Sequence, residues 1–137
     1  MITPSKVIDI AYSVINQSPI KTAMTGCLYK IDRPLNQSTE DIIINALSVS
    51  NEAVQQGIIN VNLHVPNLVL GDGGVQDNTR ADFARLDELS TIFAPTMDQL
   101  FTSGVFFEVQ NINIFPEENI AEHFVNFRII FYSKNVN

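Results

Sequence analysis

The chain has 137 residues, of which 45% are hydrophobic and 17% charged, and it carries a formal net charge of −7 with a pI near 4.6. This length suits a single domain spanning residues 1–137, and the composition excludes a disordered or fibrous chain. The eight Lys and Arg residues are dispersed, so we expect no sequence-specific nucleic-acid binding.

The chain also lacks the patterns of a secreted or membrane protein. Cys27 is the single cysteine, so an intrachain disulfide is excluded, and we predict a small buried residue in a strand. The amino terminus shows no secretory signal pattern, and the apolar runs are too short to span a bilayer. We therefore expect cytoplasmic residence and no membrane association.

The first 34 residues predict a helix followed by a strand. Thr3 is a suitable N-cap before Pro4, and apolar residues then recur at helical spacing to about Gln17. Residues 25–32 indicate a short strand, which Pro34 ends because a residue before proline favours extended geometry.

The next segment predicts two strands joined by a hairpin. Residues 41–49 contain three consecutive isoleucines, and residues 51–57 are short enough for a tight connection. Residues 59–65 then alternate with a period of two, which separates the two faces of a strand. The expected core positions are Ile59, Val61, Leu63 and Val65, and the expected outer positions are Asn60, Asn62 and His64.

A glycine-rich loop over residues 66–78 precedes the second long helix. Thr79 and Asp82 resemble a weakened capping box, and the residues that follow have apolar positions at helical spacing. Pro95 removes a backbone donor, so we expect the helix to end or kink at Ala94.

The last segment predicts a hairpin, with strands at residues 105–115 and 123–132 and an acidic turn at residues 116–119. The order of elements is then α-β-β-β-α-β-β. It predicts an α+β single domain with a mostly antiparallel sheet and helices packed on one face.

Residues with catalytic or ligand-binding chemistry form no recognisable motif. His64 and His123 lack the partners of a metal site, so we favour exposed or hydrogen-bonded strand histidines and expect no metal. Residues 71–74 are glycine-rich but lack the spacing of a phosphate-binding loop, so we expect no cofactor. We predict no enzymatic activity.

Acidic residues in two predicted loops are also explained without a binding or catalytic role. Asp72, Asp77 and Asp82 do not match the spacing of a calcium loop, and they are explained as solvated loop acids. Glu122 and the acids before it could serve as paired carboxylates, but a soluble hairpin tip explains them more simply.

The predicted strands carry an unusual number of amide side chains. Such a face suits a protein contact, although a plain solvated sheet face remains an alternative. The amide residues are Asn60, Asn62, Gln110, Asn111, Asn113 and Asn126.

Five segments carry a resemblance to a known family. They are residues 26–34 (Gly-Cys-Leu-Tyr-Lys-Ile-Asp-Arg-Pro), 40–44 (Glu-Asp-Ile-Ile-Ile), 59–66 (Ile-Asn-Val-Asn-Leu-His-Val-Pro), 85–89 (Arg-Leu-Asp-Glu-Leu) and 124–131 (Phe-Val-Asn-Phe-Arg-Ile-Ile-Phe). In their general residue pattern and their order along the chain, these segments resemble tailed-phage tail completion proteins, also called tail terminators, and related neck proteins that join head to tail.

The resemblance implies a structural virion-assembly protein that acts in the host cytoplasm and then resides in the tail or neck. Its subunits would form a homo-oligomeric ring, commonly a hexamer, between the tail tube protein and the head connector protein. As physical candidates for the contacts we take Asn60, Asn62 and His64 on the polar strand face and Asp72 and Asp77 on the long loop.

Two alternatives belong to other functional classes. A small-molecule-binding α+β protein or enzyme would have a pocket between the sheet and the second long helix, near Phe83, Phe106 and Tyr132. A dimeric adaptor unrelated to phage would instead associate through a twofold contact.

Overall fold

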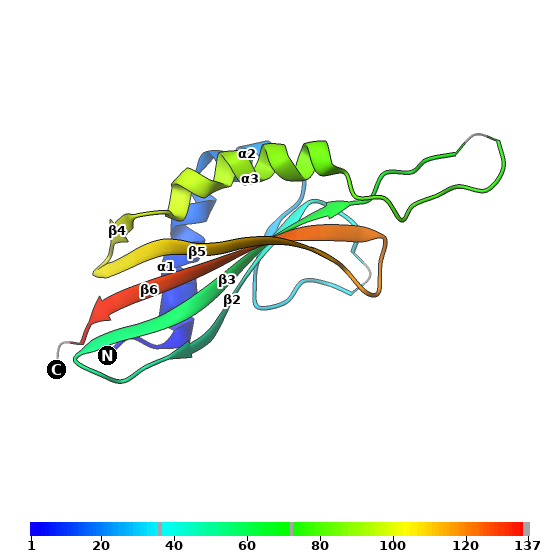
Figure 1. The fold of residues 1–137 in the computed structure, drawn as a ribbon. Helices are drawn as coiled ribbons and strands as arrows, with labels where there is room; N and C mark the ends of the chain where they lie inside the picture. The colour runs from blue at the N-terminus through cyan, green and yellow to red at the C-terminus, as the bar shows by residue number, and fades with distance from the viewer. Residues whose placement is uncertain (36, 72, 136–137) are drawn as a thin grey trace.

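The computed structural model describes residues 1–35, 37–71 and 73–135. The helices are α1 (Pro4–Asn16), α2 (Pro19–Ala23) and α3 (Phe83–Met97), and the strands are β1 (Leu28–Lys30), β2 (Asp41–Val49), β3 (Val54–Pro66), β4 (Leu100–Thr102), β5 (Val105–Pro116) and β6 (Glu122–Lys134). The strands form one sheet in the order β1-β2-β3-β6-β5-β4 (Figure 1). β1 and β2 are parallel, and the other neighbouring pairs are antiparallel.

The centre of the sheet is the long pairing of β3 with β6, whose register runs from Val54 opposite Lys134 to Pro66 opposite Glu122. Alternate residues of both strands are buried, because successive side chains of a strand point to opposite faces. The buried members include the predicted core positions Ile59, Val61, Leu63 and Val65. The predicted faces of this strand are therefore confirmed.

Helices α1 and α3 cover one face of the sheet, and the hydrophobic core lies between them and the strands (Figure 1). Phe93 of α3 packs edge-on against Phe127 of β6, with ring centroids 4.7 Å apart, and both side chains are fully buried. The predicted α+β class, with a mostly antiparallel sheet and helices on one face, is confirmed. In the ranges that the structure describes, no helix combines the length and hydrophobicity needed to span a bilayer.

The caps of the two long helices differ in how well the sequence predicted them. Thr3 caps α1 as expected, since its hydroxyl accepts from the amide of Lys6. Thr79 does not cap α3, because its hydroxyl and amide both donate to Asp77 Oδ1. Asp82 is the N-cap instead, and its carboxylate accepts from the amide of Arg85 at 3.2 Å.

Of the two outcomes predicted at Ala94, an end or a kink, the end is wrong, because the helix continues through Pro95 to Met97. Proline costs one intrahelical hydrogen bond, but here it lies in the last turn of the helix. The fully buried Met97 side chain anchors that turn in the core. Packing therefore outweighs the local preference of the proline.

Three features near the ends of the sheet also differ from prediction. α2 and β4 were not predicted, and β1 is shorter than the predicted strand at residues 25–32. Cys27 precedes β1 and is exposed, so its prediction as a buried strand residue is wrong. Leu28, the next residue, lies in β1 and is buried by its neighbours, whereas Cys27 lies outside the strand pairing and lacks such neighbours.

Candidate functional site

The face of the sheet opposite α1 and α3, here called the helix-free face, collects amide side chains from four strands. The strand register places Asn62, Asn126 and Asn113 in one row across β3, β6 and β5. A second row runs through Asn45, Asn60, Arg128 and Asn111. We define the amide patch as Asn45, Asn60, Asn62, Asn111, Asn113 and Asn126.

The centre of the amide patch is organised by its own hydrogen bonds. Asn126 Nδ2 donates to Asn62 Oδ1 at 2.7 Å and to Asn60 Oδ1 at 3.2 Å. Beside them, Arg128 Nε donates to Gln110 Oε1 at 3.2 Å. The Nδ2 groups of Asn60 and Asn62 have no partner among the described residues, so these half-buried amides can donate to a contacting molecule.

Aromatic side chains flank the amide patch toward both ends of the strands. Phe106 stacks with Tyr132 at one end, with ring centroids 6.5 Å apart. At the other end Phe124 stacks on His64 at 4.8 Å and contacts Phe115 at 5.7 Å. The face thus combines a polar centre, which is rich in amides and includes the Arg128 guanidinium, with aromatic flanks.

This placement corrects the location of the pocket that Phe83, Phe106 and Tyr132 were expected to form. Phe106 and Tyr132 are cross-strand partners on the helix-free face. Phe83 opens α3, which lies on the opposite face, and it is 66% exposed. The three side chains therefore cannot line one cavity.

One end of the helix-free face holds a buried ionic cluster, which we call the Arg33 cluster. Arg33 Nη1 lies 3.0 Å from Asp41 Oδ2, and Arg33 Nη2 contacts Glu122 Oε1. His64 Nδ1 lies 3.0 Å from the same oxygen of Glu122. The side chains of Arg33 and His64 are 8% and 4% exposed, and those of Asp41 and Glu122 are fully buried.

Strand pairing creates this cluster. Asp41 and His64 are direct partners across β2 and β3, and Glu122 begins β6 beside the end of β3. Asp41 also accepts from Thr39 Oγ1 at 2.6 Å and from the amide of Cys27 at 2.9 Å. Arg33 reaches the carboxylates from the segment between β1 and β2, so the cluster fastens that segment to the sheet.

The cluster explains two residues that the sequence left open. His64 is a hydrogen-bonded strand histidine, one of the two forms we favoured, but it is too buried to act as an open contact in this conformation. Glu122 is 1% exposed and belongs to β6, so its interpretation as a solvated hairpin-tip acid is wrong. Its Oε2 has no hydrogen-bond partner among the described residues.

The chain between β3 and α3 projects from the body of the molecule as a ribbon, which we call the arm (Figure 1). Its two sides, residues 67–70 and 77–80, pair through Leu70 and Asp77, whose amides and carbonyls exchange bonds of 2.8 and 2.6 Å. The hydroxyl and amide of Thr79 lower the pKa of Asp77. Of the two predicted contact residues in this loop, Asp77 lies on the arm, away from the amide patch. The other, Asp72, lies outside the described residues.

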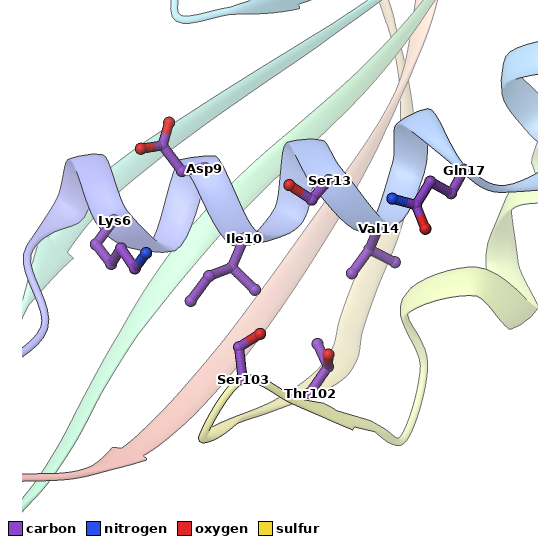
Figure 2. Close-up of a pocket in the computed structure, with 8 residues that line it drawn as sticks. All are labelled: Lys6, Asp9, Ile10, Ser13, Val14, Gln17, Thr102 and Ser103. Atoms are coloured by element: carbon purple, nitrogen blue, oxygen red, sulfur yellow. The ribbon is translucent and has the colours of Figure 1, made fainter.

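A shallow groove of about 330 Å³ runs between α1 and the turn that joins β4 to β5 (Figure 2). It is lined by Lys6, Ser13 and Gln17 of α1 and by Thr102 and Ser103 of the turn. Figure 2 shows the Asp9 carboxylate on the side of α1 away from that turn. Asp9 also lines the groove, and it pairs with Lys30 at 2.6 Å, which lowers the pKa of Asp9.

Comparisons with known proteins yield no relative: no protein-family model and no curated protein sequence matches this chain. Within the described residues, no group of three or more His, Cys, Asp and Glu side chains is arranged to hold a metal ion. Of the predicted contact residues, the structure brings Asn60 and Asn62 together and places His64 at the end of the same face. The sequence did not indicate Asn45 or Arg33, because only the strand register shows what they face.

Proposed function

We propose that this chain is a structural assembly protein of a phage or prophage, a subunit of a ring that caps the tail tube and joins it to the head connector. The observation that carries the proposal is the helix-free face, where long strands present the amide patch and its aromatic flanks. The confirmed order of elements, on which the resemblance to tail completion proteins depends, supports it.

The chemistry of the helix-free face suits a contact between proteins. Neutral amides donate and accept hydrogen bonds without the cost of burying a charge, and aromatic rings supply apolar area. Arg33 pairs with both Asp41 and Glu122 inside the sheet end, so these charged groups already have partners within the chain. A partner that covers the amide patch still has to accommodate the adjacent Arg128 cation, which bonds to the neutral Gln110.

The charge of the chain is compatible with a ring around DNA. The net charge of −7 opposes adhesion to phosphate, and a channel must let DNA slide. Of the four arginines, Arg33, Arg80 and Arg85 pair with carboxylates of the same chain. In this role the chain would assemble in the host cytoplasm and remain in the virion tail or neck.

The test is disruption of this reading frame in its parent phage or prophage, followed by electron microscopy of the particles. We expect filled heads without tails and free tails of abnormal length, and plasmid-borne wild-type chain should restore virions. Normal virions from the disrupted phage would exclude the tail role. A twofold dimer that binds no tube protein would instead favour the adaptor.

A complementation series locates the contact. Asn62→Asp keeps the acceptor for Asn126 but adds a charge to the amide patch, so we expect it to restore few virions. Asn51→Asp makes the same change in the exposed turn between β2 and β3 and should restore virions fully. Equal rescue by two folded variants would exclude this face as the contact surface.

A further inference from the structure

The outer edge of β5 is open over most of its length. β4 pairs only with the first part of β5, opposite Val105, Phe106 and Phe107. From Glu108 to Pro116 the strand pairs with β6 on one side, and no described strand pairs with it on the other. Near the start of this stretch the amide of Val109 donates to Asp98 Oδ1 at 3.0 Å, so the edge is open from Gln110 onward. Such an edge presents unpaired N–H and C=O groups, which can accept another strand.

A groove beside this edge offers apolar surface on the helix-covered side. It has a volume of about 550 Å³ and lies between α3 and β5. Phe83, Ile112 and Ile114 line it, and they are 66%, 52% and 48% exposed. Asp87 of α3 is the charged residue of its lining. The groove can therefore take an apolar side chain from a strand added to β5, beside a cation that meets Asp87.

The arm carries both groups that the groove could accept, apolar side chains and a cation. Its first side carries Leu68, Val69 and Leu70, all exposed. Its second side carries Arg80, whose side chain is 72% exposed and whose Nε lies 3.6 Å from Asp77 Oδ2 of the same arm. The backbone groups of Leu68 and Leu70 bond within the arm, so alternation turns those of Val69 to the outer edge of the ribbon. The arm thus presents an extended backbone with an unpaired edge, apolar side chains and an exposed arginine whose ion pair with Asp77 is long.

The partner that fits is a second copy of this chain. The arm projects away from the sheet, so it does not cover the β5 edge of its own molecule (Figure 1). Acidic copies repel one another, and the pairing of Arg80 with Asp87 of a neighbour would place opposite charges at the contact.

We propose that the arm of one copy adds to the open edge of β5 of the next copy, with its apolar side chains in the groove between α3 and β5. The contact deepens the proposed function and rests on it, since it supplies the repeated junction of a ring. Arm and groove are different surfaces, so the contact is heterologous and repeats around a closed ring or along an open chain.

The test uses two variants of the full chain. The arm variant, Val69→Glu with Leu70→Glu, keeps the groove, and the groove variant, Ile112→Glu with Ile114→Glu, keeps the arm. All four positions are exposed, so both variants should fold. Val54→Glu, at an exposed site in the first residue of β3, is the matched control.

At millimolar concentration, sedimentation velocity should show oligomers for the wild-type chain and the control, and monomers for each variant alone. A mixture of the two variants should form a one-to-one pair, because one intact arm meets one intact groove. In that pair, outward-facing amides of residues 110–115 should gain protection from hydrogen exchange. A monomeric wild-type chain, unchanged assembly of either variant, or a mixture that stays monomeric would each overturn the proposal.

The outcomes separate this contact from the tail role. If the variants behave as expected but disruption of the reading frame leaves virions normal, the contact stands and the tail role fails. If both variants restore virions in the disrupted phage, the tail role stands and the contact is excluded.

Discussion

The two faces of the sheet are built from the same strands but do different work. On the covered face, β6 contributes Phe127, Ile129 and Phe131, all fully buried. On the helix-free face it contributes Asn126 and Arg128, both half-buried and hydrogen-bonded to neighbouring strands. Because side chains alternate, each strand supplies one set of residues to the core and another to the helix-free face, so substitutions can test the two faces separately.

The largest expected difference compares one phenylalanine from each face. Phe127→Ala removes a fully buried ring that packs on Phe93, and we expect a loss of about 3–5 kcal/mol in the free energy of unfolding. Phe115→Ala removes a ring that is 44% exposed and should cost about 1 kcal/mol or less. Urea unfolding of both variants measures the difference, and equal losses would show that the helix-free face is also core.

The second prediction compares two arginines of the helix-free face. Arg33→Met leaves Asp41 and Glu122 buried without their cation, so we expect a loss of about 3 kcal/mol in the free energy of unfolding. Arg128→Met removes a side chain that bonds to the exposed Gln110, and it should cost about 0.5 kcal/mol. Urea unfolding at neutral pH measures both. A small loss for Arg33→Met would mean that the cluster does not fasten the segment before β2.

The third prediction concerns the ion pair on the helix side of the same sheet end. Glu40 and Asp41 are neighbours, but Glu40 receives two hydrogen bonds from Arg85 of α3, at 2.6 and 2.9 Å. These bonds hold the pKa of Glu40 below its ordinary value and raise the pKa of Arg85. Glu40→Gln should therefore lower the free energy of unfolding at neutral pH by about 1–2 kcal/mol.

The pH dependence of this loss follows from the sign of the shift. A glutamate with a lowered folded-state pKa stabilises the protein fully above its unfolded-state pKa, and this contribution disappears as the pH falls through the folded-state pKa. The difference between wild type and Glu40→Gln should thus be constant down to about pH 5 and shrink below it. Glu88→Gln, at a carboxylate that is 60% exposed, is the control and should show little difference. A difference that persists at low pH would contradict the ion-pair explanation.

The sequence predicted the covered face better than the helix-free face, and the reason is physical. A period of two identifies core positions such as Ile59 and Val61 without knowledge of any neighbour. α2 and β4 have five and three residues, too few to show a period.

The candidate site depends on pairing between strands that are far apart in the sequence. Arg33 and Glu122 are 89 residues apart in the sequence. The pairing of β2, β3 and β6 brings Asp41 and Glu122 to one end of the sheet, where Arg33 reaches both from the segment before β2. The amides of Asn60, Asn62 and Asn126 were visible in the sequence, but their convergence depends on the same register. Their role as a contact surface stays a prediction.

The smallest expected effect is that of a substitution at Cys27, which precedes β1. Leu28, the first residue of β1, serves as the comparison. Cys27 is exposed and Leu28 is 6% exposed in the core. Cys27→Ser should therefore change the free energy of unfolding by about 0.5 kcal/mol or less, whereas Leu28→Ala should lower it by about 2–4 kcal/mol. Urea unfolding measures both, and thiol labelling of the folded wild-type chain should proceed without denaturant. A large loss for Cys27→Ser would mean that the Cys27 side chain packs in the core at this corner of the sheet, which would contradict its exposure.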